Sequence, residues 1–110
     1  MEYKVEILEE ASKFILKLEP KMQAKVQYSI KLLEEFGYLL TEPHSKKVTG
    51  KKELYELRVK VGTDICRLFY FFWKNKTYII LSGYVKKENK LKKSEIEKAM
   101  KLLKLVKETL

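Results

Sequence analysis

The chain has few of the residues that metal and thiol chemistry require. Its 110 residues include one cysteine, Cys66, and one histidine, His44. One cysteine cannot form an internal disulfide, and this pair is too small for a structural zinc site. Cys66 falls within a segment that alternates like a strand, so we expect a buried core thiol and not a nucleophile. We therefore expect no metal and no other cofactor.

Long apolar runs are also missing. No stretch approaches the ~18 apolar residues of a membrane span, and Met1 is followed by charged residues and not by a signal peptide. There is no glycine-rich phosphate loop, and no convincing Ser-His-Asp set can be assembled. A hydrophobic fraction of 45% argues against disorder. We expect one cytoplasmic domain spanning residues 1–110, without a membrane partner.

Acidic residues are scarce in the middle of the chain. Residues 41–93 hold 14 of the 24 basic residues and 5 of the 15 acidic ones, so they carry the whole net charge of +9. Positive charge concentrated in one segment indicates a phosphate-rich partner. Because 22 of the basic residues are lysine, a general lysine bias explains part of this excess. It does not explain why both arginines, Arg58 and Arg67, fall in the same segment.

The apolar pattern predicts an α+β fold in the order β-α-α-β-β-β-α. We expect a three-stranded antiparallel core sheet, an added N-terminal strand, and all helices on one face. Pro20 suits the first turn of the second helix, Gly37 its end, and Ser94 the N-cap of the last helix. The expected strands are 3–8, 54–61, 64–73 and a fourth after the turn at Asn75-Lys76. The expected helices are 11–18, 20–36 and 94–109, and residues 38–52 are expected to form a loop.

Two short turns fix the predicted strand register. Gly62-Thr63 is typical of a two-residue type II′ turn, which sets Arg58 opposite Arg67. A two-residue turn at Asn75-Lys76 then sets Arg67 opposite Tyr84. One face would carry Tyr55–Tyr70–Leu81, Leu57–Leu68–Gly83 and Val59–Cys66–Val85, and the other Glu56–Phe69–Ser82, Arg58–Arg67–Tyr84 and Lys60–Ile65–Lys86.

Facing arginines destabilise a sheet, so a chain that keeps them is expected to use them on an anion. RNA can be cleaved without metal because its 2′-hydroxyl is an internal nucleophile. Arg58 and Arg67 suit stabilisation of the phosphorane, a crowded lysine such as Lys86 suits proton removal, and Tyr84 suits the acid or a stacking surface. The expected RNA-binding residues are Lys46, Lys47, Lys60, Lys87 and Lys90. The simpler alternative is that the arginines form salt bridges with Glu56.

Four motifs together resemble the HigB-like branch of the RelE/ParE superfamily of type II toxins, phage-derived relatives included. They are Leu54-Tyr-Glu-Leu-Arg58, Cys66-Arg67-Leu-Phe-Tyr70, Ile80-Leu-Ser-Gly-Tyr-Val-Lys86-Lys87 and Glu95-Ile-Glu-Lys-Ala99. The resemblance implies a metal-independent mRNA endonuclease that acts on the ribosome. Its implied partner is a helix-turn-helix antitoxin, in a heterotetramer.

The resemblance also assigns residues. The family's sheet arginines correspond to Arg58 and Arg67, its strand-end lysines to Lys86 and Lys87, and its loop lysines to Lys46 and Lys47. The chain departs from the family at Ser82, where members often have His, and at Tyr84, where they often have Phe.

The missing histidine removes one candidate general base or acid. Phe69 and Phe71, expected on the polar face, could be covered by an antitoxin. A ParE-like inhibitor of DNA gyrase and a non-catalytic RNA-binding protein remain as alternatives.

Overall fold

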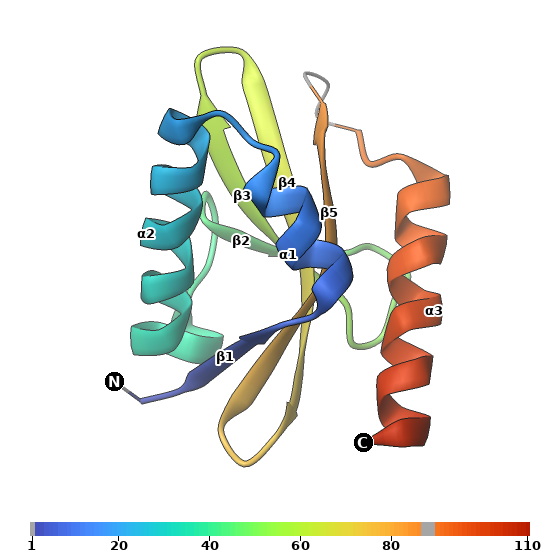
Figure 1. Cartoon of the computed structure of the whole chain (residues 1–110). Helices are drawn as coiled ribbons and strands as arrows, with labels where there is room; N and C mark the ends of the chain where they lie inside the picture. The colour runs from blue at the N-terminus through green and yellow to red at the C-terminus, as the bar shows by residue number, and fades with distance from the viewer. Residues whose placement is uncertain (1, 87–89) are drawn as a thin grey trace.

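The computed structural model describes residues 2–86 and 90–110, which form a five-stranded sheet with helices on both faces (Figure 1). The strands lie in the order β1-β5-β4-β3-β2, with β1 parallel to β5 and all other pairs antiparallel. The predicted α+β order is confirmed, with β2 as an addition inside the expected loop 38–52. The strand bounds are β1 Lys4–Ile7, β2 Ser45–Lys47, β3 Tyr55–Val61, β4 Asp64–Lys74 and β5 Thr77–Lys86.

Two helices, α1 (Glu9–Leu16) and α2 (Pro20–Phe36), cover one face of the sheet. Pro20 occupies the start of α2, where its missing N–H leaves no hydrogen bond unmade. Gly37 ends α2 at a φ of 53°, and a side chain there would clash with the ring of Tyr3. A short 3-10 turn, η1 (Gly37–Leu39), follows. The apolar stripes of α1 and α2 pack on the face that was predicted to receive helices.

The third helix, α3 (Lys93–Thr109), packs on the opposite face, so the prediction of all helices on one face is wrong. Its buried residues Ala99, Leu103 and Val106 meet Phe69 and Phe71, which are fully buried. The expected polar face is therefore half apolar. The chain's own helix covers the two phenylalanines for which a partner was considered.

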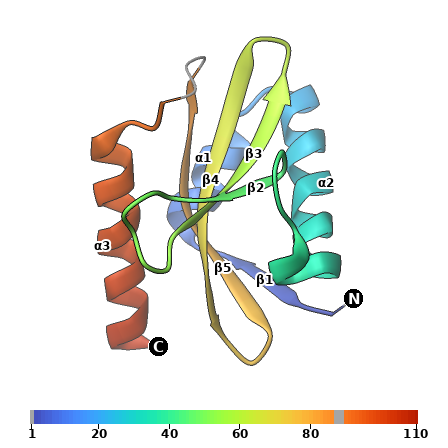
Figure 2. The same cartoon turned by 180° about the vertical axis from the view of Figure 1, so that it is seen from behind.

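The segment between β2 and β3 also reaches α3, as Figure 2 shows. Val48 and Leu54 join the apolar cluster under the helix, and Lys107 of α3 forms an ion pair with Glu53. At its start, α3 has Lys92 as N-cap and no side-chain cap, so the prediction that Ser94 caps it is wrong. The backbone N–H of Lys92 instead donates to the hydroxyl of Tyr84.

The strand register is as predicted at both ends of the β4–β5 hairpin and differs in its middle. Lys74 pairs with Thr77 across the expected two-residue turn, and Phe69 pairs with Ser82. Between them Tyr70 pairs with Ile80 and not with Leu81. A bulge at Trp73 on β4 shifts the pairing by one residue, and a bulge at Leu81 on β5 restores it. Leu81 consequently packs under α3, on the face opposite to the one predicted.

Candidate active site

Arg58 on β3 lies directly opposite Arg67 on β4, as the turn at Gly62-Thr63 predicted. Gly62 has the positive φ of 60° that a type II′ turn requires at its first central position. Tyr84 on β5 is the next residue in the row, opposite Arg67. Since side chains alternate along a strand, this row points to the α3 side of the sheet, and Tyr84 borders the cluster under α3.

The two arginines differ sharply in exposure. The side chain of Arg58 is 26% exposed, whereas that of Arg67 is 0% exposed. The expectation of two guanidiniums on an open face therefore holds only for Arg58. Arg67 is an interior residue.

Glu56 resolves the electrostatic conflict between the two arginines. Its Oε1 lies 3.5 Å from Nε of Arg58 and 3.6 Å from Nε of Arg67, and its side chain is only 4% exposed. Burial raises the pKa of Glu56 above its ordinary value, and the positive charges of Arg58 and Arg67 oppose that rise. The carboxylate thus neutralises part of the charge of the row and links its two cations.

Arg67 also contacts the last strand. Its Nη1 donates a hydrogen bond to the carbonyl of Lys86 at 3.3 Å, and its guanidinium carbon lies 5.8 Å from the ring centre of Tyr84. A buried charge is tolerated only with such partners. Arg67 therefore ties together β3, β4 and β5 at the row.

Tyr84 connects the row to α3. Its ring stacks on Phe69 with centroids 6.1 Å apart, and its hydroxyl accepts a hydrogen bond of 2.8 Å from the N–H of Lys92. That bond uses a lone pair of the oxygen, so the hydroxyl proton is still available for donation. Tyr84 can therefore act as a proton donor while it holds the start of α3.

A hollow of about 310 Å³ opens beside this cluster, and we call it the basic hollow. Glu56 and Arg58 form part of its wall, and among the described residues that line it Glu56 is the only acidic one. The predicted RNA-binding residues Lys46, Lys47 and Lys90 come together here from two separate segments. The other lining residues are Val48, Thr49, Leu91 and Ile96.

The remaining predicted lysines are placed differently. Lys60 and Lys86 lie one row beyond the arginines, where both pair across Ile65, and neither lines the basic hollow. Lys87 lies outside the described residues. Lys46 is exposed, and its Nζ lies 3.8 Å from Oε1 of Glu42. Solvent weakens this exposed ion pair.

From the sequence, Glu56 was considered only as a salt-bridge partner of the arginines. The structure adds that its carboxylate lies between Arg58 and Arg67 and lines the basic hollow. Alternation already placed Glu56 on the face of Arg58 and two residues away from it. Glu56 is also the one acidic residue in the three rows predicted for that face, and this pattern could have indicated its role. Ser82, at the family's frequent histidine position, is 1% exposed and cannot replace an accessible histidine.

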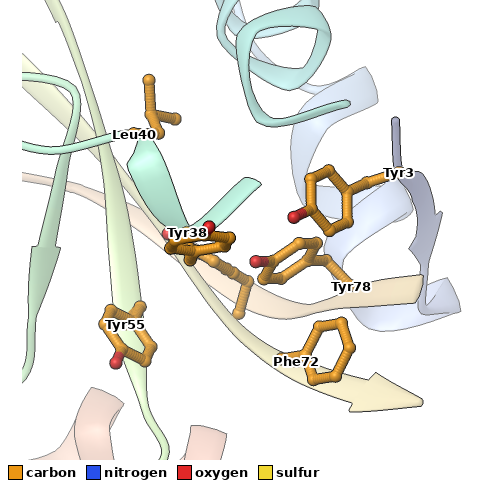
Figure 3. A pocket seen from close by; sticks show the side chains of 7 residues that line it. Tyr3, Tyr38, Leu40, Tyr55, Phe72 and Tyr78 are labelled. Atoms are coloured by element: carbon orange, nitrogen blue, oxygen red, sulfur yellow. The ribbon is translucent and has the colours of Figure 1, made fainter. Parts of the chain in front are cut away.

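A second hollow, of about 330 Å³, lies on the α1–α2 side of the sheet and is almost wholly aromatic. Figure 3 shows the rings of Tyr3, Tyr78 and Phe72 in succession along one wall. Tyr78 meets Tyr3 and Phe72 edge to face, at centroid distances of 5.4 and 5.1 Å. None of the described residues that line this hollow carries a charge, so the hollow does not suit a phosphate.

Cys66 is buried in the core, as predicted. Burial raises the pKa of its thiol to about 12, which keeps it protonated and unreactive at neutral pH. Within residues 2–86 and 90–110, no three side chains of the His, Cys, Asp or Glu type are grouped so that they could hold a metal ion. Over the same residues, no helix is long and apolar enough to cross a membrane.

Residues 13–104 match the model of the family described as Phage derived protein Gp49-like (DUF891). The chain belongs to this Gp49-like family. A comparison with curated proteins gave no match. The family match covers α2, the strands β2 to β5 and every residue that lines the basic hollow, so the candidate site lies within the matched part of the chain.

The Gp49-like chain has the fold of RelE toxins. A mutant of E. coli toxin RelE in the free state matches with a TM-score of 0.68 at 20% identity, over 92% of this chain and 97% of that chain. RelE from the RelE–RelB complex of Pyrococcus horikoshii OT3 matches at 0.54 and 23% identity, over 76% and 93%. The toxin–antitoxin complex RelBE2 of Mycobacterium tuberculosis gives 0.60 and 20%, over 78% and 100%. At these identities the likeness establishes the fold.

Proposed function

We propose that this Gp49-like protein is the toxin of a type II toxin–antitoxin pair and cleaves mRNA on the ribosome. The observation that carries the proposal is the buried carboxylate of Glu56 beside Arg58 in the wall of a hollow rimmed by lysines. A phosphate can bind to the fork of Arg58 and to Lys46, Lys47 and Lys90. The RelE fold and the Gp49-like family support the toxin assignment, and the HigB-like branch stays a prediction.

The reaction needs one proton acceptor, one proton donor and stabilisation of negative charge. The 2′-oxygen of the RNA forms a bond to phosphorus while the bond from phosphorus to the 5′-oxygen breaks. We assign Glu56 as the acceptor of the 2′-hydroxyl proton, because its carboxylate lines the basic hollow beside Arg58 and burial raises its pKa above the ordinary value. Tyr84 gives a proton to the departing 5′-oxygen. The products end in a 2′,3′-cyclic phosphate and a 5′-hydroxyl.

The charge on the phosphorane falls to Arg58, with Lys86 near the same end of the sheet. Arg67 is fully buried, so we assign it a positioning role through its contacts with Glu56 and Tyr84. Lys60, Lys87 and Lys90 are proposed to contact flanking phosphates. This division explains why one arginine of the pair is accessible and the other is not.

We further propose a cognate helix-turn-helix antitoxin as the partner, in a toxin–antitoxin heterotetramer. RelE proteins of two of the matched structures were solved together with their antitoxins. The chain carries a net charge of +9, which suits an acidic binding segment.

The test is a cleavage assay with purified protein, mRNA-programmed ribosomes and a chelator. We expect fragments with 2′,3′-cyclic phosphate ends that require ribosomes and form in the presence of the chelator. Arg58→Ala is expected to lower the rate by at least 100-fold, as for loss of one charge-stabilising donor. Lys101→Ala on α3 serves as the control. An unchanged cleavage rate in Arg58→Ala would remove the basic hollow as the site of the reaction.

A further inference from the structure

A third hollow, of about 570 Å³, lies on the other side of Arg58, between α2 and the edge of β3. We call it the α2 groove. One wall comes from α2 and the other from β3 and the residues that lead into β2, which run beside α2 in Figure 2. Its lining residues are Ala24, Lys25, Tyr28, Ser29, Pro43, His44, Arg58, Val59 and Lys60.

Arg58 lines both the basic hollow and the α2 groove. The short strand β2 pairs with β3 only as far as Leu57, after which the N–H of Arg58 donates to the carbonyl of His44. Beyond this point β2 no longer borders the edge of β3. Arg58 therefore stands at the edge of β3 between the basic hollow on the α3 side of the sheet and the α2 groove on the α2 side. A chain bound in the basic hollow would pass round this edge at Arg58 to enter the α2 groove.

The charge of the α2 groove has one sign. Within the part of the chain that the structure describes, no acidic residue lines it, while Lys25, Arg58 and Lys60 do. Lys25 belongs to α2, whose 17 residues include three lysines and two glutamates. Its ammonium group donates to the carbonyl of Lys60 at 3.2 Å, which draws the charge toward the β3 wall.

Tyr28 adds an aromatic surface to this groove. It lies on α2 and is 61% exposed, although the neighbouring residues Val26 and Ile30 are buried in the core. Exposed aromatic rings set among cations are the elements from which single-stranded nucleic-acid sites are built, because every base has a face that can stack.

We propose that the α2 groove binds the stretch of single-stranded mRNA next to the phosphate that is cleaved. Lys25 and Lys60 hold phosphates of this stretch, and Tyr28 stacks on one of its bases. The assignment rests on the proposed function, since it takes the strand in the basic hollow to be RNA. The positive charge of the lysines and arginine that line the groove, and the residue Arg58 that it shares with the basic hollow, favour this occupant.

The test measures binding without cleavage. The probe is a fluorescent single-stranded oligoribonucleotide with 2′-O-methyl groups, which lacks the nucleophile, and anisotropy is followed against salt concentration. The variant with both Lys25→Ala and Lys60→Ala is expected to bind less tightly, with a salt slope smaller by about 0.7 for each lost phosphate contact. Tyr28→Ala is expected to bind about tenfold less tightly at an unchanged salt slope.

The matched control is the double variant with Lys101→Ala and Lys104→Ala, which removes the same charge from α3 and is expected to leave the affinity close to that of the wild type. Equal losses in the groove and control variants would reduce the effect to net charge and overturn the proposal. Failure of the wild-type protein to bind the probe at low salt would also overturn it.

A second arm separates mRNA from ribosomal RNA. Binding of the wild-type and groove variants is compared on empty ribosomes and on ribosomes programmed with 2′-O-methyl mRNA. We expect the groove variants to lose affinity on programmed ribosomes only. A similar loss on empty ribosomes would assign the groove to ribosomal RNA and contradict the proposal. Groove-dependent binding in a protein that cleaves no mRNA would sustain the groove and reject the nuclease, so the two proposals can fail separately.

Discussion

Oε1 of Glu56 lies 3.6 Å from Nε of Arg67, and the two side chains are 4% and 0% exposed. The same oxygen lies 3.5 Å from Nε of the more exposed Arg58. The arginine pair that faces across the hairpin is thus part of an ion cluster with one accessible end. The cluster contributes to the stability of the fold and also provides groups for the proposed reaction. Substitutions at its residues separate these two roles.

Replacement of Arg67 by Ala is expected to destabilise the fold far more than replacement of Arg58. Arg67→Ala leaves Glu56 buried beside a single cation, and breaking a buried ion pair in this way costs about 3 kcal/mol. Arg58→Ala is expected to cost about 1 kcal/mol, because its side chain is 26% exposed and solvent weakens its ion pair with Glu56. Denaturant unfolding of both variants measures the difference. Equal losses would mean that Arg67 is not an interior charge.

Glu56→Gln tests the protonation of the cluster. Burial raises the pKa of Glu56 above its ordinary value of 4.5, so the folded protein binds this proton more tightly than the unfolded chain does. Its contribution to the free energy of unfolding therefore falls as pH rises from about 4.5 through the higher folded pKa. We expect the stability of the wild type relative to Glu56→Gln to decrease over that window. A relative stability that increases with pH would show that the arginines dominate and lower the pKa.

Tyr84→Phe separates anchoring from proton donation. The change removes the hydrogen bond from Lys92 and keeps the ring that stacks on Phe69, so we expect a loss of about 1 kcal/mol in stability. If Tyr84 donates the proton, the cleavage rate should fall by about 100-fold or more, while RNA binding is retained. Tyr38→Phe, at a 76% exposed tyrosine in the aromatic hollow, is the control. A rate that follows stability alone would leave Tyr84 as an anchor.

Leu103→Ala tests whether α3 is an integral part of the core. Leu103 is 4% exposed in the cluster with Phe69 and Phe71, and truncation of such a leucine costs about 3 kcal/mol. Leu105→Ala, on the same helix but 54% exposed, should change stability by about 0.5 kcal/mol or less. Thermal and denaturant unfolding compare the two. Similar small effects would indicate that α3 is only loosely docked.

The arrangement of the hairpins could be predicted because the chain determines it locally. Gly62-Thr63 and Asn75-Lys76 fix two-residue turns, and a turn of known length fixes every pair near it. The middle of the β4–β5 hairpin could not be predicted in the same way. The bulges at Trp73 and Leu81 compensate each other, so they leave both ends of the register unchanged and give no local signal.

The placement of α3 and the depth of Arg67 depend on tertiary contacts. Phe69 and Phe71 indicated that something covers the second face, but alternation cannot tell a partner from the chain's own helix. Once α3 lies on that face, Tyr84 is held against Phe69 and closes over Arg67. The burial of Arg67 is therefore a consequence of a long-range contact, and the residue type gave no sign of it.

The central claim is that the cluster of Glu56 and Arg58 cleaves mRNA on the ribosome. It is tested most directly by inducible expression of the wild-type and Arg58→Ala proteins, followed by mapping of mRNA 5′ ends on ribosomes. We predict new 5′-hydroxyl ends within coding regions, at the onset of growth arrest, for the wild type and a near absence of them for Arg58→Ala at equal protein levels. Growth arrest with intact mRNA, or with a DNA damage response in its place, would contradict the account.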